Sequence, residues 1–231
     1  MSLKALLLDA GGTLLTEQPS REALYARAAT RRGLAITPPA MRQCMLRAHG
    51  ALPLTLNGNF RYSRPWFEAF IADVFVRQLG LKPGELPAVI QELFAEFTNA
   101  SNFQLLPGAR ELVDGARERG WKLALVSNWS PSMPALLARL RILHAFDRVL
   151  ISAIEGVEKP DPEIFERALS RLNVQAGEAL HLGNEPVQDV RGAGACGIRT
   201  LLFDPRAEHK ALGLPSVARL REVIPWIEAQ C

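Results

Sequence analysis

The amino-acid sequence predicts an α/β protein in which a doubly wound parallel sheet carries an inserted α-helical bundle. Three observations predict this fold class. The apolar run at residues 3–8, LKALLL, is typical of a strand buried on both faces, and it ends at Asp9. Residues 20–103 carry only helical signals, and strand and helix patterns alternate after Pro107. Repeated β-α-β units with right-handed crossovers give a parallel sheet covered on both faces.

The composition is that of an ordinary globular protein, with 48% hydrophobic and 22% charged residues. The formal net charge is +3, but the basic residues are scattered, and the pair Arg31 and Arg32 is their largest cluster. We therefore expect neither nucleic acid nor a membrane surface as a partner. No apolar run approaches the ~18 residues of a membrane span, and the first strand leaves no room for a signal peptide. The expected location is the cytoplasm.

The three cysteines, Cys44, Cys196 and Cys231, are odd in number, far apart in the chain and without the spacing of a zinc site. This pattern predicts reduced thiols rather than disulfides. We expect Cys44 and Cys196 to be small core residues.

The helical stretch divides into four amphipathic helices. Ser20 caps the first, which runs to residue 33, and Pro38 opens the second. Ser63 with Pro65 opens the third, and the fourth follows Pro83. Short connections between such helices predict a small bundle. The segment between the second and third helices, ALPLTLNGNFRYSRP, either lines a substrate pocket or is a solvated connection.

The remainder of the chain alternates between the two kinds of element. The expected order is a helix at residues 107–118, a strand at 122–126, a helix opened by Ser130 and Pro131, a strand at 148–152, a helix opened by Asp161 and Pro162, a strand at 179–182, a helix at 186–195 and a strand at 200–203. Ser216 caps a closing helix, which Pro225 kinks or splits.

Polar residues follow four of the predicted strands, where the carboxyl ends of parallel strands converge on one crevice. They are Asp9 after the first strand, Ser127 and Asn128 after the second, Lys159 after the third, and Asn184 and Asp189 after the fourth. A second glycine pattern is unrelated to this set. Gly192, Gly194 and Gly197 match a nucleotide-binding signature, but they close a helix and precede a strand, which is the wrong context for that function.

Four segments together resemble the haloacid dehalogenase-like hydrolase superfamily over nearly the whole chain. LLLDAGGTLL is similar to its first motif, LALVSN to its second, EKPDPEIF to its third and HLGNEPVQDVRGAG to its fourth. The resemblance implies a Rossmann-like core at residues 1–16 and 104–231. It also implies a helical cap domain at residues 17–103, of the type inserted between the first two motifs and overhanging the carboxyl edge of the sheet.

The resemblance further implies a site for phosphoryl transfer. Asp9 would be the nucleophile, and Lys159 would neutralise developing charge. The phosphate would be held by Gly12, Thr13, Ser127 or Asn128, and Lys159. Mg²⁺ would be held by Asp9, Gly11, Asn184 and Asp189.

Physical chemistry supports these roles. An aspartate can accept a phosphoryl group as an aspartyl-phosphate, which splits one displacement into two. Because an anionic substrate repels a bare carboxylate, a cation must offset the charge, and Mg²⁺ suits carboxylate and carbonyl oxygens. Lys159 supplies a compact positive charge that can hold both nucleophile and phosphate.

Two positions depart from the phosphatase branch of this family. The residue two places after the nucleophile is there a second aspartate that acts as general acid and base, whereas here it is Gly11, which cannot move a proton. Loss of a positioned acid costs roughly 10²–10⁴ in rate, so replacing Gly11 by Asp is expected to raise turnover of poor leaving groups. The first acidic position of the fourth motif is Asn184, a neutral ligand. Glu17 and Glu185 are candidate replacement acids, or plain solvated glutamates.

Three functions follow from this pattern. The first is a Mg²⁺-dependent phosphohydrolase acting on a small phosphorylated metabolite whose leaving group needs little protonation. The second is a metal-independent 2-haloacid dehalogenase, because SNWSP at residues 127–131 is similar to the dehalogenase second motif, although those enzymes carry an aromatic residue at the position of Gly11. The third is a catalytically impaired protein that binds phosphoryl ligands. The pattern leaves the substrate and the oligomeric state open.

Overall fold

The computed structural model describes residues 3–230, so the prediction for Cys231 lies outside the described residues. The chain divides into two compact units, Met1–Thr16 with Leu105–Cys231, and Glu17–Gln104. Each unit has its own core and is described by itself. No helix among residues 3–230 is both long and apolar enough to span a bilayer.

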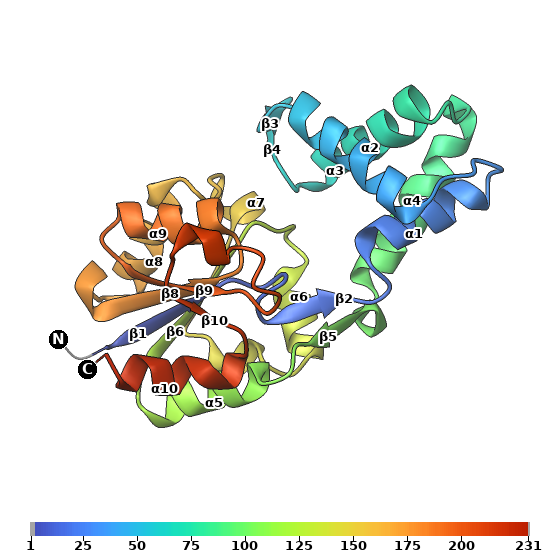
Figure 1. The fold of residues 1–231 in the computed structure, drawn as a ribbon. Helices are drawn as coiled ribbons and strands as arrows, with labels where there is room; N and C mark the ends of the chain where they lie inside the picture. The colour runs from blue at the N-terminus through green and yellow to red at the C-terminus, as the bar shows by residue number, and fades with distance from the viewer. Residues whose placement is uncertain (1–2, 231) are drawn as a thin grey trace. The chain divides into compact units, whose positions relative to one another are not determined.

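The first unit is built on a six-stranded sheet in the order β10-β9-β8-β1-β6-β7, and every pair in it is parallel (Figure 1). The strands are β1 (Ala5–Leu8), β6 (Lys122–Ser127), β7 (Arg148–Ile151), β8 (Ala179–Gly183), β9 (Arg199–Phe203) and β10 (Ser216–Val217). The chain builds outward from β1 through β6 and β7, then returns to the other side of β1 with β8. This reversal places a topological switch point beside β1, where open α/β sheets bind ligands.

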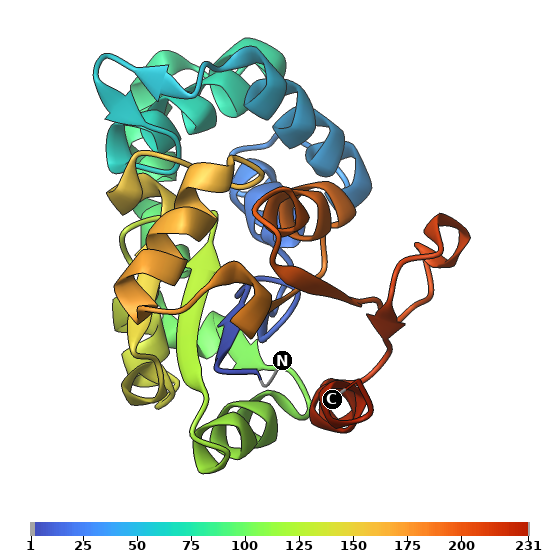
Figure 2. The same ribbon diagram turned by 90° about the vertical axis from the view of Figure 1, so that its left-hand side faces the viewer.

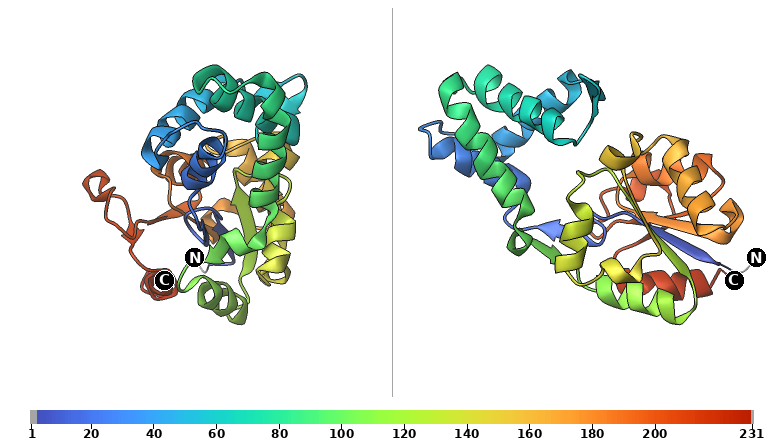
Figure 3. Two further views of the ribbon diagram at one scale, coloured as in Figure 1. Left: turned by 90° about the vertical axis from the view of Figure 1, so that its right-hand side faces the viewer. Right: turned by 180° about the vertical axis from the view of Figure 1, so that it is seen from behind.

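Helices cover both faces of this sheet. Figures 1 and 3 show α5 (Ala109–Glu118) and α10 (Val223–Glu228) on one face, with α8 (Pro162–Leu172) and α9 (Gly192–Ala195) on the other. Two short helices, α6 (Met133–Arg139) and α7 (Ser152–Glu155), follow β6 and β7. The helix α8 buries its apolar side, including Ile164 and Phe165, against β1, β6 and β7. The predicted α/β fold class is confirmed.

The second unit holds the expected helices around an aromatic-rich core. They are α1 (Arg21–Thr30), α2 (Pro38–Ala51), α3 (Arg64–Ala72), which continues as a π-helix (Asp73–Gln78), a 3₁₀ turn (Pro83–Glu85) and α4 (Leu86–Thr98). Tyr25, Trp66 and Phe75 are fully buried in this core. The strands β2 (Leu15–Glu17) and β5 (Phe103–Leu105) pair where the chain passes between the two units.

The connection between α2 and α3 is more ordered than the sequence analysis expected. It contains a hairpin of β3 (Thr55–Leu56) and β4 (Asn59–Phe60), drawn in cyan in Figure 2. Asn57 and Gly58 form its turn with φ of 49° and 78°. Asn-Gly is a strong signal for a two-residue hairpin turn because both residues tolerate positive φ.

Three element predictions were wrong. Ser216 does not cap a helix, because it forms the edge strand β10 with Val217, and the closing helix α10 begins later, at Val223. Pro225 neither kinks nor splits α10, since it lies in the first turn, where backbone N–H groups have no partner in the helix. Ser130 likewise does not cap α6, which begins at Met133.

Candidate active site

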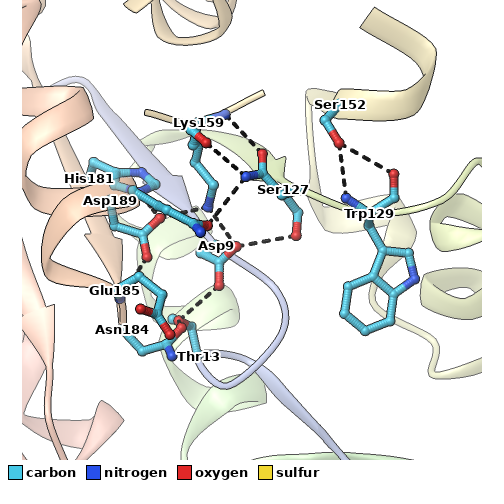
Figure 4. A network of polar contacts seen from close by, with 12 residues as sticks. Asp9, Thr13, Ser127, Trp129, Ser152, Lys159, His181, Asn184, Glu185 and Asp189 are labelled. Atoms are coloured by element: carbon cyan, nitrogen blue, oxygen red, sulfur yellow. Dashed lines mark hydrogen bonds and ion pairs between the residues drawn. The ribbon is translucent and has the colours of Figure 1, made fainter. Parts of the chain in front are cut away.

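Asp9 follows β1 directly and faces the side chain of Lys159. The Lys159 Nζ donates to Asp9 Oδ1 at 2.7 Å and to Asp189 Oδ1 at 2.6 Å (Figure 4). The three side chains are buried, with Lys159 only 2% exposed. Elements from three parts of the sequence therefore bring one ammonium between two carboxylates at the switch point.

Two hydroxyl groups complete the surroundings of the Asp9 carboxylate. Ser127, the last residue of β6, donates from Oγ to Asp9 Oδ1 at 3.2 Å. The buried Thr13 Oγ1 lies 3.2 Å from Asp9 Oδ2 and 3.0 Å from Asn184 Oδ1. Because a hydroxyl has one proton, Thr13 donates to one of these oxygens at a time. Asp9 and Asn184 therefore meet around the same hydroxyl.

The charges in this cluster shift one another's protonation. Burial raises the pKa of Asp9, Lys159 opposes that rise and Asp189 adds to it. Burial acts to lower the pKa of Lys159, but Asp189 and Asp9 prevail and raise it. Burial acts to raise the pKa of Asp189, but Lys159 and His181 hold it well below its usual range. These shifts favour a charged Lys159 facing an ionised Asp189.

Asn128 has a different task from the phosphate contact expected of it. Its Nδ2 donates to the Lys159 carbonyl at 2.9 Å, and its Oδ1 accepts from the Lys159 N–H, also at 2.9 Å. Nδ2 also donates to Gln188 Oε1. Asn128 therefore fixes the backbone of Lys159, whereas its neighbour Ser127 is the residue that contacts Asp9.

Gly12 also serves the conformation of the loop. It has a positive φ of 78°, which favours glycine, and its N–H donates to the Leu15 carbonyl at 2.8 Å, so this N–H is already used within the turn. A Cβ at position 12 would lie 2.8 Å from Asn184 Nδ2. Gly12 thus allows the turn to pack against Asn184, and the phosphate contact predicted for it gains no support.

Sequence reasoning missed two residues behind Asp189. His181, buried in β8, places Nε2 3.0 Å from Asp189 Oδ1, and because that carboxylate is ionised the imidazole donates. A Cβ at Gly183 would lie 2.1 Å from Asp189 Cγ, so only glycine lets this carboxylate fold back toward Lys159. The Glu185 N–H holds the other oxygen, Oδ2, at 2.9 Å. A histidine within the apolar strand ALHLG was the available signal.

Comparison with known proteins decides the family. A model of the haloacid dehalogenase-like hydrolase family matches residues 3–197. This chain belongs to the haloacid dehalogenase-like hydrolases. Haloacid dehalogenase-like hydrolase domain-containing protein 3 of Bos taurus is 30% identical over 99% of this chain and 96% of its own. A phosphoserine phosphatase of Thermus thermophilus is 32% identical over 87% of this chain and 89% of its own.

A solved structure agrees with the fold of this hydrolase. The HAD-hydrolase YfnB from Bacillus subtilis superimposes with a TM-score of 0.77 at 19% identity, covering 99% of this chain and 100% of its own. Together with its phosphatase-named relative, the family match identifies the protein as a phosphatase-like hydrolase.

The space beside Gly11 in this hydrolase is filled. A Cβ at position 11 would lie 2.7 Å from Cζ3 of the Trp129 indole, which is closer than such atoms approach. The expectation that replacing Gly11 by Asp alone raises turnover therefore needs correction, because the indole stands where the new side chain would begin.

The donor atoms near Asp9 fit Mg²⁺ that is shared with phosphate. Among residues 3–230, no three or more His, Cys, Asp or Glu side chains are grouped so as to hold a metal ion. Asp9 and Asn184 nevertheless direct one carboxylate and one amide oxygen at the Thr13 hydroxyl. Mg²⁺ binds through one or two carboxylates and completes its shell with water and substrate phosphate. This set suits a weakly held metal.

The two candidate replacement acids lie in different surroundings. Glu17 forms an ion pair with Arg21, so its carboxylate already has a partner. Burial raises the pKa of Glu185, and the charges of Asp189 and Asp9 raise it further. A carboxylate of raised pKa is suited to carry a proton, so Glu185 stays a candidate proton donor.

Proposed function

We propose that this hydrolase is a Mg²⁺-dependent phosphohydrolase of small phosphorylated metabolites that works through an aspartyl-phosphate on Asp9. The observation that carries the proposal is the buried Lys159 ammonium, 2.7 Å from Asp9 and 2.6 Å from Asp189. It offsets the charge of a nucleophile that has to meet an anion. The phosphoserine phosphatase relative supports the same reaction class.

In the first step, one oxygen of the Asp9 carboxylate attacks phosphorus, and the bond from phosphorus to the leaving oxygen breaks with its electron pair. Lys159 and the Ser127 hydroxyl remain as donors that stabilise the added negative charge. Asp189 and Asn128 hold Lys159 in place, through its ammonium and its backbone respectively.

In the second step, water attacks the phosphorus of the aspartyl-phosphate. Inorganic phosphate leaves, the Asp9 carboxylate is restored and the proton of the water passes to phosphate or solvent. Asp9, Asn184 and the Gly11 carbonyl, with Asp189 nearby, are the groups that would hold Mg²⁺, which when bound neutralises phosphate charge. The turn Gly11–Thr13 brings no side-chain acid to protonate the leaving group, which favours acyl and aryl phosphates.

A phosphatase panel with and without Mg²⁺ tests this function. We expect the wild type to hydrolyse acyl and aryl phosphates, and we expect chelation of the metal to abolish this turnover. In Asp9→Asn the turnover rate should fall by at least about 10³-fold. Circular dichroism of Asp9→Asn controls for folding. Full activity in Asp9→Asn would refute the nucleophile.

The dehalogenase alternative has one observation in its favour. Asn184 stands at the first acidic position of the fourth motif, and its amide oxygen is a neutral metal ligand. In that reaction Asp9 attacks carbon and halide leaves without a proton. Chloride release from 2-chloropropionate in the presence of chelator would establish it. The third function, a catalytically impaired protein that binds phosphoryl ligands, has its own test. It would be supported if aluminium or beryllium fluoride binds together with Mg²⁺ while no substrate is turned over.

A further inference from the structure

Trp129 is the side chain that closes the space beside position 11. The benzo edge of its indole points at Gly11, where a Cβ would meet Cζ3 at 2.7 Å, Cε3 at 3.6 Å and Cη2 at 3.7 Å. Every non-glycine residue carries a Cβ, so the conflict arises before the identity of the side chain matters. Gly11 and Trp129 therefore depend on each other.

The backbone of Trp129 is held, so the indole cannot withdraw with its chain. Its N–H donates to the Oγ of the fully buried Ser152 at 3.2 Å, and its carbonyl accepts from the Ala153 N–H at 3.4 Å. Figure 4 shows Ser152 above this backbone, with the indole extending away from it. Relief of a clash at position 11 must come from rotation of the indole or movement of the turn.

The turn that holds Gly11 also has little room to move at Gly12. Gly12 approaches Asn184 so closely that a Cβ there would lie 2.8 Å from Nδ2 and 3.1 Å from Cγ. The turn is also closed by backbone hydrogen bonds from Gly12 to Leu15 and from Leu14 to Ala10, both of 2.8 Å. A shift of the turn would therefore disturb Asn184 and these bonds.

We infer that Trp129 is a specificity-determining residue: its indole keeps position 11 free of a proton donor and forms an aromatic wall beside the nucleophile loop, selecting phosphates with planar leaving groups that depart unprotonated. This inference rests on the proposed phosphohydrolase function. The P–O bond breaks with its electron pair on a phenolate or carboxylate oxygen, which needs no proton. A flat aryl group gains contact with the indole, which an alkyl group matches less well.

The steric part is tested without turnover, by thermal unfolding of a double-mutant cycle. Gly11→Ala is expected to lower the Tm by roughly 2–10 °C in the wild type and by much less in Trp129→Ala. Gly194→Ala is the matched control, because nothing lies within 4 Å of a Cβ there and no loss of Tm is expected. Equal losses from Gly11→Ala in both backgrounds would overturn the inference.

The specificity part is tested by the slope of log kcat/KM against the pKa of the leaving group, over aryl phosphates and one alkyl phosphate. We expect a steep slope in the wild type and in Gly11→Asp. The double variant Gly11→Asp, Trp129→Ala should have a shallow slope and hydrolyse the alkyl phosphate roughly 10²–10⁴ times faster. A shallow slope in Gly11→Asp alone would overturn the inference.

Two further variants address the aromatic wall and the remaining acid. Trp129→Ala should raise KM for phenyl phosphate relative to acetyl phosphate by about 2–10-fold, and Trp129→Phe should restore much of it. Glu185→Gln should keep the wild-type slope, and a steeper slope would show that Glu185 already protonates the leaving group. If no wild-type activity depends on Asp9, the proposed function fails, while the Tm cycle still reports on the indole.

Discussion

Lys159 lies between the Asp9 and Asp189 carboxylates, and all three side chains are buried. A buried charge of this kind is tolerated when partners and hydrogen bonds compensate it, and removing one member leaves the others exposed to the full cost of burial. In this cluster the cation is shared, because both Asp9 and Asp189 accept from the same Nζ. Both acids therefore lose a charged partner if the lysine is removed.

Replacing Lys159 by Met should destabilise the protein by about 3–5 kcal/mol, because two buried carboxylates then lack their cation. Activity should fall as well, since the pKa of Asp9 rises further and the nucleophile becomes protonated. Urea unfolding and phosphatase assays measure the two effects. Lys82→Met, at an exposed site, is the control and should change stability by less than about 0.5 kcal/mol. A small loss in Lys159→Met would mean that water reaches the cluster.

Tyr25 gives a second test at this scale. Burial, which is nearly complete, raises the pKa of its phenol well above the ordinary value. The folded state then keeps a proton that the unfolded chain loses above pH ~10, so stability should fall as the pH rises beyond that point. Denaturant unfolding at pH 8 to 11 should show this decline in the wild type and a weaker one in Tyr25→Phe. Parallel declines would exclude Tyr25 as the cause.

At the residue scale, the sequence predicted which residues lie together better than it predicted the contacts that each one makes. Asp9, Lys159 and Asp189 were found because each follows an apolar strand, and parallel strands share one carboxyl edge. The contact of Trp129 with Gly11 was not predictable, because it depends on a side-chain rotamer between residues distant in the chain. The sequence could not divide the contacts between Ser127 and Asn128, because both residues follow the same strand; in the structure Ser127 contacts Asp9 and Asn128 contacts the Lys159 backbone.

The helix α8 fixes the loop that carries Lys159 through its first turn. Its N-cap, Asp161, accepts from the Glu163 N–H at 2.9 Å, while Asp161 itself donates its N–H to the Glu158 carbonyl at 2.9 Å. The loop that carries Lys159 is therefore fixed at one end by a helix cap and in its middle by Asn128.

Asp161→Ala should cost about 0.5–2 kcal/mol of stability, because the cap bond is lost. It should also lower kcat by up to about 10²-fold, since the Lys159 loop loses an anchor. Ser20→Ala is a matched control: Ser20 caps α1 by accepting from the Ala23 N–H, so stability should fall without the same loss of kcat. If both variants lose kcat equally, the Asp161 cap does not act on catalysis through the Lys159 loop.

Elements were predictable where they are long or buried. The strands β1, β6 and β8 read as apolar runs because both of their faces are covered. The strand β10 was missed because Ser216 and Val217 are too few residues to form a pattern. The hairpin at Asn57 and Gly58 was missed although its turn signal was present.

Each of the two compact units contains a hydrophobic cluster that is built from its own described residues. Tyr25, Trp66 and Phe75 belong to the core of residues 17–104, whereas Phe165 and Leu169 belong to a core shared by the sheet and α8. Separate cores permit separate unfolding, because stability within a protein follows local burial.

Phe75→Ala should destabilise its core by about 3–5 kcal/mol, because a large buried ring is removed. Hydrogen exchange should then accelerate within residues 17–104 while the strands beside Asp9 keep their protection. Phe165→Ala is the converse variant and should accelerate exchange in the first unit. Acceleration throughout the chain in both variants would show that the units unfold together.

Gly183 defines how this chain tolerates redesign. Even one methyl group at that position would overlap the Asp189 carboxylate, which lies 2.1 Å from the site of a Cβ, whereas Gly194 has open space. In a saturation library, position 183 should return glycine alone, and position 194 should accept many residues. A library built on this protein can therefore keep the codon for Gly183 fixed and randomise the codon for Gly194.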